Sequence, residues 1–312
     1  MTMHDAMLSA ELVAVLVAVT GEQPRVLTTH CARALPAGPL QHSHRSLQNG
    51  LRQWVEEQTH HKLGYVEQLY TFADKGRFYA SGERVISVSY LALTIEDVAA
   101  QESGVGWQDW YRYFPWEDWR DGMPTSLDAV ILPALRAWAA SDPELETTRW
   151  QRLVYAFGLD GFMWSEDMVL QRYELLYEAG LVPEATREPL SDELDAADPV
   201  YGLAMRYDHR RILATGMARL RAKIKYRPVM FELMPESFTL LQLQKTVEAI
   251  AGRALHKQNF RRLVEQQNLV EETGLSTVGT AGRPAKLFHF KKDVIAERAI
   301  AGTTLPLARQ AR

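Results

Sequence analysis

A stretch beginning at Gly38, GPLQHSHRSLQNGLRQWVEEQ, carries acidic residues at a spacing that suits phosphate chemistry. Residues 51–58 have helical character, and Glu56 and Glu57 follow Arg52 by about one helical turn. Paired carboxylates on a helix can hold Mg²⁺ against a diphosphate. This segment is therefore the first candidate for a binding or catalytic site.

The spacing resembles the pattern of the Nudix superfamily of diphosphate hydrolases, G-x5-E-x7-R-E-U-x-E-E-x-G-U, in which U is aliphatic. The positions that match are Gly38, Arg52, Glu56 and Glu57. The positions that depart from it are His44, Gln53, Trp54, Thr59 and His60. Gln53 brings no negative charge, so Mg²⁺ would lose one anionic ligand of about three. We expect hydrolysis to be absent or vestigial, no catalytic residue to remain, and Mg²⁺ to bind weakly at most.

Histidine and cysteine offer a different kind of metal site in principle. The histidines near the candidate segment are His42, His44, His60 and His61, but no carboxylate accompanies them at ligand spacing, so we expect solvated loop histidines and no metal. The chain has one cysteine, Cys31, which excludes an internal disulfide and a zinc site built from cysteines. A reducing cytoplasm fits this cysteine usage.

The pattern of apolar residues predicts an α+β fold for the first half of the chain. Val-rich runs at residues 12–19 and 85–93 and an aromatic segment at 65–72 predict strands around the helix at 51–58. Four tryptophans follow between residues 107 and 119, and we expect them to pack in a core or an interface. Residues 126–180 are mostly helical in pattern. No apolar run approaches the ~20 residues of a membrane-spanning helix.

The net charge of −4 conceals an uneven distribution along the 312 residues. Residues 1–204 contain 15 Lys and Arg against 30 Asp and Glu, whereas residues 205–312 contain 20 against 9. An acidic body with a basic C-terminal third predicts that this third meets a polyanion.

The basic third begins with a predicted helix at residues 208–226. Its apolar residues recur at helical spacing, at Ile212, Leu213, Met217, Leu220 and Ile224. We expect its basic residues to load the remaining surface with positive charge; they are Arg210, Arg211, Arg219, Arg221, Lys223 and Lys225.

Two short helices joined by a tight turn come next. Thr239 and Gln242 form a capping box at the start of the first helix, and Gly252 is placed to end it. The second, at about 255–267, should bury Phe260, Leu263 and Val264. Its other face presents His256, Lys257, Gln258, Asn259, Arg261 and Arg262. Amides and guanidiniums can read base edges and cations can contact phosphates, so this helix is a candidate major-groove reader.

A predicted hairpin completes the module. Residues 269–272 and the alternating segment at 286–290 flank a glycine-rich loop that contains Arg283, the candidate wing contact to DNA. Helix-turn-helix plus hairpin is the winged-helix arrangement. The alternative is a basic protein-interaction domain, a role that winged helices also serve.

The chain as a whole resembles the Nudix-related transcriptional regulators of bacterial NAD metabolism. The resemblance rests on the degenerate box at 38–60, on YTFADKGR with RVISVSYLAL, on YDHRRIL, and on the segments FTLLQLQKTVEAIAGRALHKQNFRRLVEQQNLVEETG and GRPAKLFHF. It implies a Nudix-like α/β/α sandwich at residues 1–226, a winged helix at 227–295 and a tail at 296–312. This chain departs from the family pattern by a helical insertion at about 124–203.

The resemblance also implies a function and a set of contacts. It implies a cytoplasmic homodimeric repressor of NAD metabolism genes that binds a near-palindromic operator in double-stranded DNA and needs no cofactor. The effector would be an adenine nucleotide: ADP-ribose, NAD or ATP. Phosphate, ribose or base contacts would come from Arg52, Glu56, Glu57, Tyr70, Phe72, Arg77 and Arg84.

Two alternatives stay open at this stage. One is a working Mg²⁺-dependent Nudix hydrolase of ADP-ribose or a related nucleoside diphosphate derivative, using Glu56 and Glu57 and carrying a basic accessory domain. The other is a scaffold protein that only binds partners. Turnover of ADP-ribose separates the first from a regulator, and specific operator binding separates both from the second.

Overall fold

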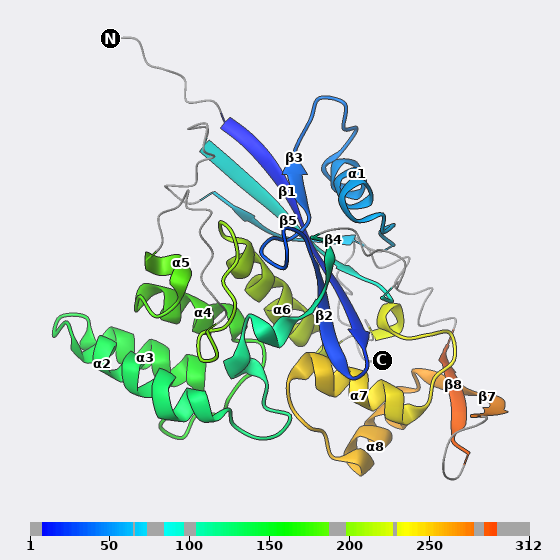
Figure 1. The fold of residues 1–312 in the computed structure, drawn as a ribbon. Helices are drawn as coiled ribbons and strands as arrows, with labels where there is room; N and C mark the ends of the chain where they lie inside the picture. Colours follow the sequence, from blue (N-terminus) through cyan, green and yellow to red (C-terminus); the bar gives the residue numbers. More distant parts are fainter. Residues whose placement is uncertain are drawn as a thin grey trace, which may run out of the picture.

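The computed structural model describes residues 8–64, 66–73, 84–96, 104–186, 198–226, 230–277 and 284–291. The N-terminal part is a six-stranded sheet with helices on both faces, and the C-terminal part pairs two helices with a separate two-stranded sheet (Figure 1). This arrangement confirms the predicted α+β class.

The six-stranded sheet has the order β4-β5-β1-β2-β6, and β3 pairs with β1 off this path. The long central strand β1 is parallel to β5 and antiparallel to β2 and β3. The strands are β1 Leu8–Thr20, β2 Gln23–Thr28, β3 Ala37–Pro39, β4 Val66–Phe72, β5 Arg84–Leu93 and β6 Gly106–Asp109.

Both faces of β1 are buried because side chains alternate between the two sides of a strand. Leu12, Ala14 and Leu16 pack in one hydrophobic cluster with Leu51 and Val55 of helix α1, Leu47–Thr59. The alternating residues Val13, Val15 and Val17 belong to the larger cluster on the opposite face. The unbroken apolar run that predicted this strand is therefore explained by burial on both sides.

Helix α6, His209–Tyr226, and the insertion cover the opposite face. The insertion contributes α2 Leu132–Ala140, α3 Glu146–Phe157, α4 Val169–Glu178 and the short α5 Pro183–Thr186. Its buried residues Ile131, Leu135, Val169 and Leu175 lie in the same cluster as Val13, whereas Val130 is exposed. The insertion thus extends the core of the body. Among the described residues, no helix combines the length and the apolar character needed to cross a membrane.

The basic face predicted for α6 is largely wrong. Arg210 and Arg221 are buried, and Arg210 contacts Glu184 of α5 at 3.1 Å. Arg211 pairs with Glu174 at 2.8 Å, and Lys223 pairs with Glu67. Of the basic side chains of α6 that the structure describes, Arg219 is the exposed one; the side chain of Lys225 lies outside the described part. The sequence period shows where each residue lies around the helix. It does not show that acids of α4, α5 and β4 pair with the basic face of α6 and make it an interface within the protein.

A buried ionic network lies where the tryptophan-rich segment meets α4 and α6. Glu117 ends the short helical turn Pro115–Glu117 and is fully buried, as are Arg172 of α4 and Arg221. Arg172 donates from Nε to Glu117 Oε1 at 2.6 Å and from Nη2 to Oε2 at 2.8 Å. Arg221 donates from Nη1 to Oε2 at 2.6 Å. We call these three residues the Glu117 network.

The two guanidiniums determine the charge state of Glu117. Burial alone would raise the pKa of this carboxyl, but Arg172 and then Arg221 outweigh burial and hold the pKa below its ordinary value. The third nitrogen of the Arg172 guanidinium is also hydrogen-bonded. Arg172 Nη1 donates to the carbonyls of Ala156 and Ser165 at 2.8 and 3.0 Å.

The C-terminal part has the predicted helix-turn-helix and hairpin. Helix α7, Leu240–Ala251, begins at the Thr239–Gln242 capping box and ends at Gly252, which has φ 71°. Helix α8, Lys257–Gln267, buries Phe260 and Val264, while Leu263 is 50% exposed, contrary to expectation. Strands β7, Val270–Ser276, and β8, Lys286–Phe290, pair antiparallel. The predicted wing contact Arg283 lies outside the described residues.

Substituting Glu117→Gln tests the Glu117 network. The variant leaves two buried guanidiniums facing a neutral amide, so we expect a loss of about 3–5 kcal/mol in the free energy of unfolding at neutral pH. Because the folded pKa is lowered, the carboxylate's contribution is present above the ordinary value of 4.5 and is lost as pH falls toward the folded pKa. Denaturant titrations of wild type and variant should therefore converge on acidification.

Glu178→Gln in the same insertion is the matched control. Glu178 pairs with Arg152 at 2.5 Å, but both side chains are more than 40% exposed, so we expect at most about 1 kcal/mol. Equal losses in the two variants would contradict the role assigned to Glu117.

Candidate functional site

Helix α1 presents the acids of the degenerate Nudix box to solvent. Ser46 caps its start, accepting from the amide of Asn49 at 3.1 Å. Glu56 is exposed and lies 3.6 Å from Lys62, and Glu57 accepts from Gln53 Nε2 at 2.8 Å. The two acids are thus engaged with a cation and with an amide.

Arg52, the third retained position of the box, contacts the protein's own backbone. Its guanidinium donates to the carbonyl of Leu63 and, at 2.7 Å, to that of Gly64. These bonds hold the segment that follows α1. The contact is structural as observed, and a phosphate contact from Arg52 would have to share or replace it.

Gly38 and Trp54 explain why part of the box survives. A Cβ at Gly38 would lie 2.3 Å from Trp54 Cδ2, so only glycine admits the indole at this place. Trp54 Nε1 also donates to the carbonyl of Pro39 at 2.8 Å. His44, where the first acid of the pattern belongs, accepts from the Gln41 amide at 3.1 Å and packs edge-on against Trp54. The frame of the box is kept by packing.

These residues do not fit a magnesium site. Mg²⁺ is held by oxygen ligands with near-octahedral geometry, whereas the positions of two pattern acids hold an imidazole and a neutral amide. Glu56 already faces the ammonium of Lys62, which opposes a second cation. Within the described ranges, no group of three or more His, Cys, Asp or Glu side chains is arranged to hold a metal ion.

The other predicted effector contacts lie around β4 and β5. Tyr70 is 58% exposed and packs against Phe72 at 4.9 Å between ring centroids, but Phe72 is buried in the large core cluster. Of the two aromatic candidates, only Tyr70 has a free ring surface on which a base could stack. Arg84 is exposed at the start of β5 and donates to the Ala73 carbonyl at 3.1 Å; Arg77 lies outside the described residues.

The structure separates the predicted effector residues into two groups. Arg52, Glu56 and Glu57 lie on α1, which covers the face of β1 that Leu12 and Leu16 share. Phe72 packs in the cluster on the opposite face. Arg84 alternates in phase with Val88 and Tyr90 of β5, which belong to the cluster of α1, so it lies on the α1 side of the sheet, apart from Phe72.

A polar pair that the sequence analysis missed joins β1 and β5. Glu11 of β1 is 9% exposed and accepts from Ser87 Oγ of β5 at 2.7 Å. Ser89, two residues further along β5, donates to the carbonyl of Tyr70 at 2.8 Å. An acid within an apolar strand run was the available signal, but the parallel register of β1 and β5 that pairs Glu11 with Ser87 is a tertiary property.

Helix α8 forms the candidate nucleic-acid surface. All six side chains predicted for DNA contact are exposed: His256, Lys257, Gln258, Asn259, Arg261 and Arg262. None of them makes a side-chain hydrogen bond or ion pair with another described residue. Phe260 and Val264 anchor the opposite side of the helix in the core. Exposed amides and guanidiniums on an anchored helix have the chemistry of a groove reader.

Comparison with known proteins supports the assignment of this domain. The family described as NrtR DNA-binding winged helix domain matches residues 230–290. An ADPR responsive transcriptional repressor NtrR of Acinetobacter baylyi is 40% identical over 88 residues, which are 28% of this chain. The match spans 35% of the length of that relative.

Solved structures extend the similarity to the whole fold. The NrtR of Shewanella oneidensis in complex with a 27mer DNA superposes with a TM-score of 0.54 at 22% identity, covering 92% of this chain and 95% of its own. A MutT/nudix family protein of Enterococcus faecalis gives 0.52 at 16% identity, covering 93% and 89%. The comparisons agree with the resemblance found in the sequence: residues 230–290 match the NrtR DNA-binding winged helix family, and the fold of the chain is similar to that of the Shewanella NrtR.

Proposed function

We propose that this protein is a DNA-binding transcriptional repressor of NAD metabolism genes, controlled by an adenine nucleotide. The observation that carries the proposal is the exposed polar and basic face of α8, within a domain that matches the NrtR DNA-binding winged helix. The Acinetobacter relative is named a transcriptional repressor, and the Shewanella NrtR was solved with DNA. In this proposal, residues 1–226 sense the effector and 227–295 bind DNA.

ADP-ribose is the favoured effector, ahead of NAD and ATP. The Acinetobacter relative is named as responsive to ADPR, and a Nudix-type fold is suited to a diphosphate. Candidate contacts are Tyr70 and Arg84, which are exposed. Effector binding would change DNA affinity by favouring one state of the protein over another.

A homodimer and a near-palindromic operator belong to the same proposal. A two-fold symmetric dimer presents two copies of α8, and symmetry then requires inverted half-sites about one or two helical turns apart. Regulation without catalysis is favoured over hydrolysis because the similar proteins of this type are regulators and the box offers no suitable metal ligands.

The first experiment tests which residues of α8 read sequence. An operator fragment is recovered by in vitro selection with the wild-type protein, and binding is compared with a random duplex of equal length. We expect Asn259→Ala to cost about 1–3 kcal/mol on the operator and little on random DNA. Arg261→Ala should weaken both and reduce the slope of affinity against salt, because fewer counterions are released.

Gln267→Ala, at the end of α8, is the control and should change neither affinity. Arg283→Ala, in the predicted wing, should behave like Arg261→Ala if that residue contacts phosphate. Equal losses on operator and random DNA for Asn259→Ala would show that α8 does not read bases.

A second experiment identifies the effector. Thermal unfolding is measured with ADP-ribose, NAD and ATP, and a ligand present at 100 times its Kd should add about 2.7 kcal/mol of stability. We expect ADP-ribose to give the largest shift. Arg84→Ala should reduce that shift while leaving the unliganded melting temperature nearly unchanged, because Arg84 is exposed.

Arg52→Ala is the matched comparison. Removal of its bonds to the carbonyls of residues 63 and 64 should lower the melting temperature even without ligand. A full ADP-ribose response in Arg84→Ala would remove that residue from the site.

The third experiment concerns turnover. With Mg²⁺ present, we expect no hydrolysis of ADP-ribose or NAD above the protein-free rate, because the positions of Gln53 and His44 lack the acids that a metal requires. Product formation is followed by chromatography over a range of Mg²⁺ concentrations. A metal-dependent rate that disappears in Glu56→Gln would favour the hydrolase alternative.

A further inference from the structure

The C-terminal end of α7 is capped by residues of the body. The last carbonyls of a helix have no partner within the helix and carry its negative dipole end. Here Tyr111 donates from Oη to the Ala249 carbonyl at 2.7 Å, and Arg221 donates from Nε to the Ile250 carbonyl at 2.9 Å. A cation and a hydroxyl of the body therefore complete the first helix of the helix-turn-helix.

The turn between α7 and α8 is held equally closely. Trp119 donates its amide to the Gly252 carbonyl at 2.7 Å, and Trp119 and Arg253 form a parallel bridge. A Cβ at Gly252 would lie 2.4 Å from the Glu117 carbonyl oxygen, so glycine is required both by its φ of 71° and by this approach. The turn thus lies directly against the Glu117 network.

The insertion reaches the same turn by two routes. Arg172 of α4 supplies one of the two guanidiniums of the Glu117 network. Glu166, ahead of α4, forms an ion pair with Arg253 in the turn, and its backbone carbonyl accepts from Arg221 Nη1 at 3.1 Å. The side chain of Glu166 is 10% exposed and that of Arg253 is 54% exposed, so the pair lies at the surface and solvent screens it in part.

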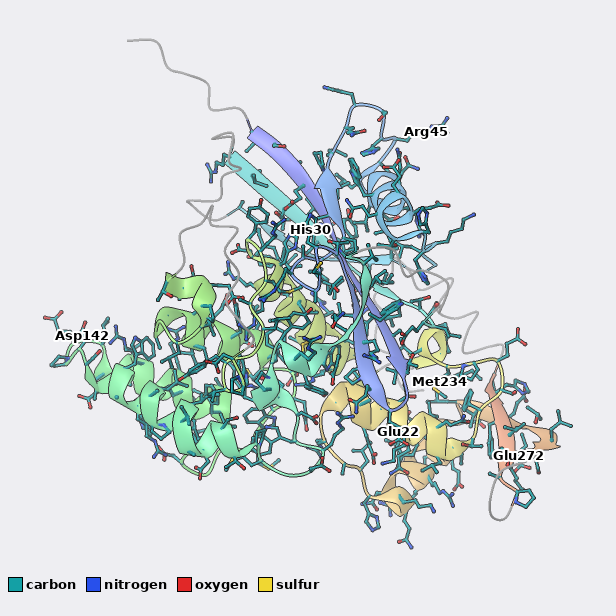
Figure 2. All side chains as sticks on the ribbon, viewed as in Figure 1. Glu22, His30, Arg45, Asp142, Met234 and Glu272 are labelled. Atoms are coloured by element: carbon teal, nitrogen blue, oxygen red, sulfur yellow. The ribbon has the colours of Figure 1, made fainter. Side chains whose placement is uncertain are left out.

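A third contact meets α7 one turn earlier along the helix, at Lys245. Glu22, at the turn between β1 and β2 and labelled in Figure 2, lies 3.8 Å from Lys245 of α7. Arg120 donates to the Glu22 carbonyl at 2.7 Å and pairs with Asp118 at 2.7 Å. Body residues thus hold α7 along its length as well as at its end.

We propose that the insertion is a brace that fixes the orientation of the helix-turn-helix on the body, with Glu166 as its positioning residue through the ion pair to Arg253. This inference rests on the proposed function in so far as the helix-turn-helix reads DNA. The brace acts on the turn, and the turn sets the direction in which α8 leaves α7. The insertion therefore contributes to DNA affinity without supplying a DNA contact.

The direction in which Glu166→Gln changes DNA affinity distinguishes a positioning role of Glu166 from the effect of its charge alone. Removing an acid close to a DNA-binding domain should raise the affinity for DNA, because repulsion of the phosphates is reduced. Removing the brace should lower it, because the correctly oriented state becomes less populated. Glu166→Gln removes an acid and also removes the brace, so these two effects change DNA affinity in opposite directions.

The experiment compares full-length wild type, Glu166→Gln and the control Glu178→Gln. Glu178→Gln removes the same charge from the insertion, at an exposed pair with Arg152 that does not touch the winged helix. Amide hydrogen exchange of Trp119 reports release of the turn, and amides of β1 report global unfolding. Affinity is measured on the selected operator and on a random duplex.

We expect Glu166→Gln to speed exchange at Trp119 by about tenfold, the factor expected for one charge-assisted hydrogen bond, with exchange in β1 unchanged. Operator affinity should fall although a negative charge is lost, and Glu178→Gln should behave as wild type. In exchange measurements, the double variant Glu166→Gln, Arg253→Gln should release the turn no more than either single variant.

Unchanged exchange at Trp119 in Glu166→Gln would overturn the brace. Faster exchange with equal or higher operator affinity would overturn its positioning role. If the wild type selects no operator, the proposed function fails, and exchange at Trp119 still decides whether the insertion holds the turn.

Discussion

The rest of the structure depends on one buried carboxylate, Glu117, held between the guanidiniums of Arg172 and Arg221. Removing charges from water costs several kcal/mol per ion, and the cost is offset only when every donor and acceptor finds a partner in good geometry. The partners here come from the insertion, α6 and the end of α7. All hydrogen bonds of the network can therefore form only when the insertion, α6 and α7 are packed together. The network thus favours this one arrangement of the body and the helix-turn-helix.

The central strand β1 connects the Glu11–Ser87 pair of the sheet with the contact to α7. Near its start lie Glu11 and the neighbouring residues of β5, and at its end Glu22 contacts α7. A strand buried on both faces transmits a displacement along its length because close-packed interiors do not deform continuously. The charge distribution supports the same division: acids of the body neutralise Arg210, Arg211 and Arg221, and the basic side chains of α8 stay exposed.

In the segment that resembles a Nudix box, the residues retained from the pattern have packing roles that do not need the metal-binding acids. Gly38 is required by the indole of Trp54, and Arg52 holds the backbone after α1 through two carbonyls. These contacts do not depend on a charge at residue 44 or 53. The fold of this segment therefore does not require acids at residues 44 and 53.

The sequence by itself determined the elements: the strand pattern of β1 and β5, the capping box at Thr239, and the apolar anchors of α8, because these depend on local periodicity and capping. It also predicted the type of the C-terminal domain, since residues 230–290 match the NrtR DNA-binding winged helix family. Only the tertiary structure decided that Arg210 and Arg221 are buried, that Phe72 is in the core, and that Glu11 meets Ser87. These outcomes depend on partners distant in the chain, and local periodicity carries no information about which acid will face a given arginine.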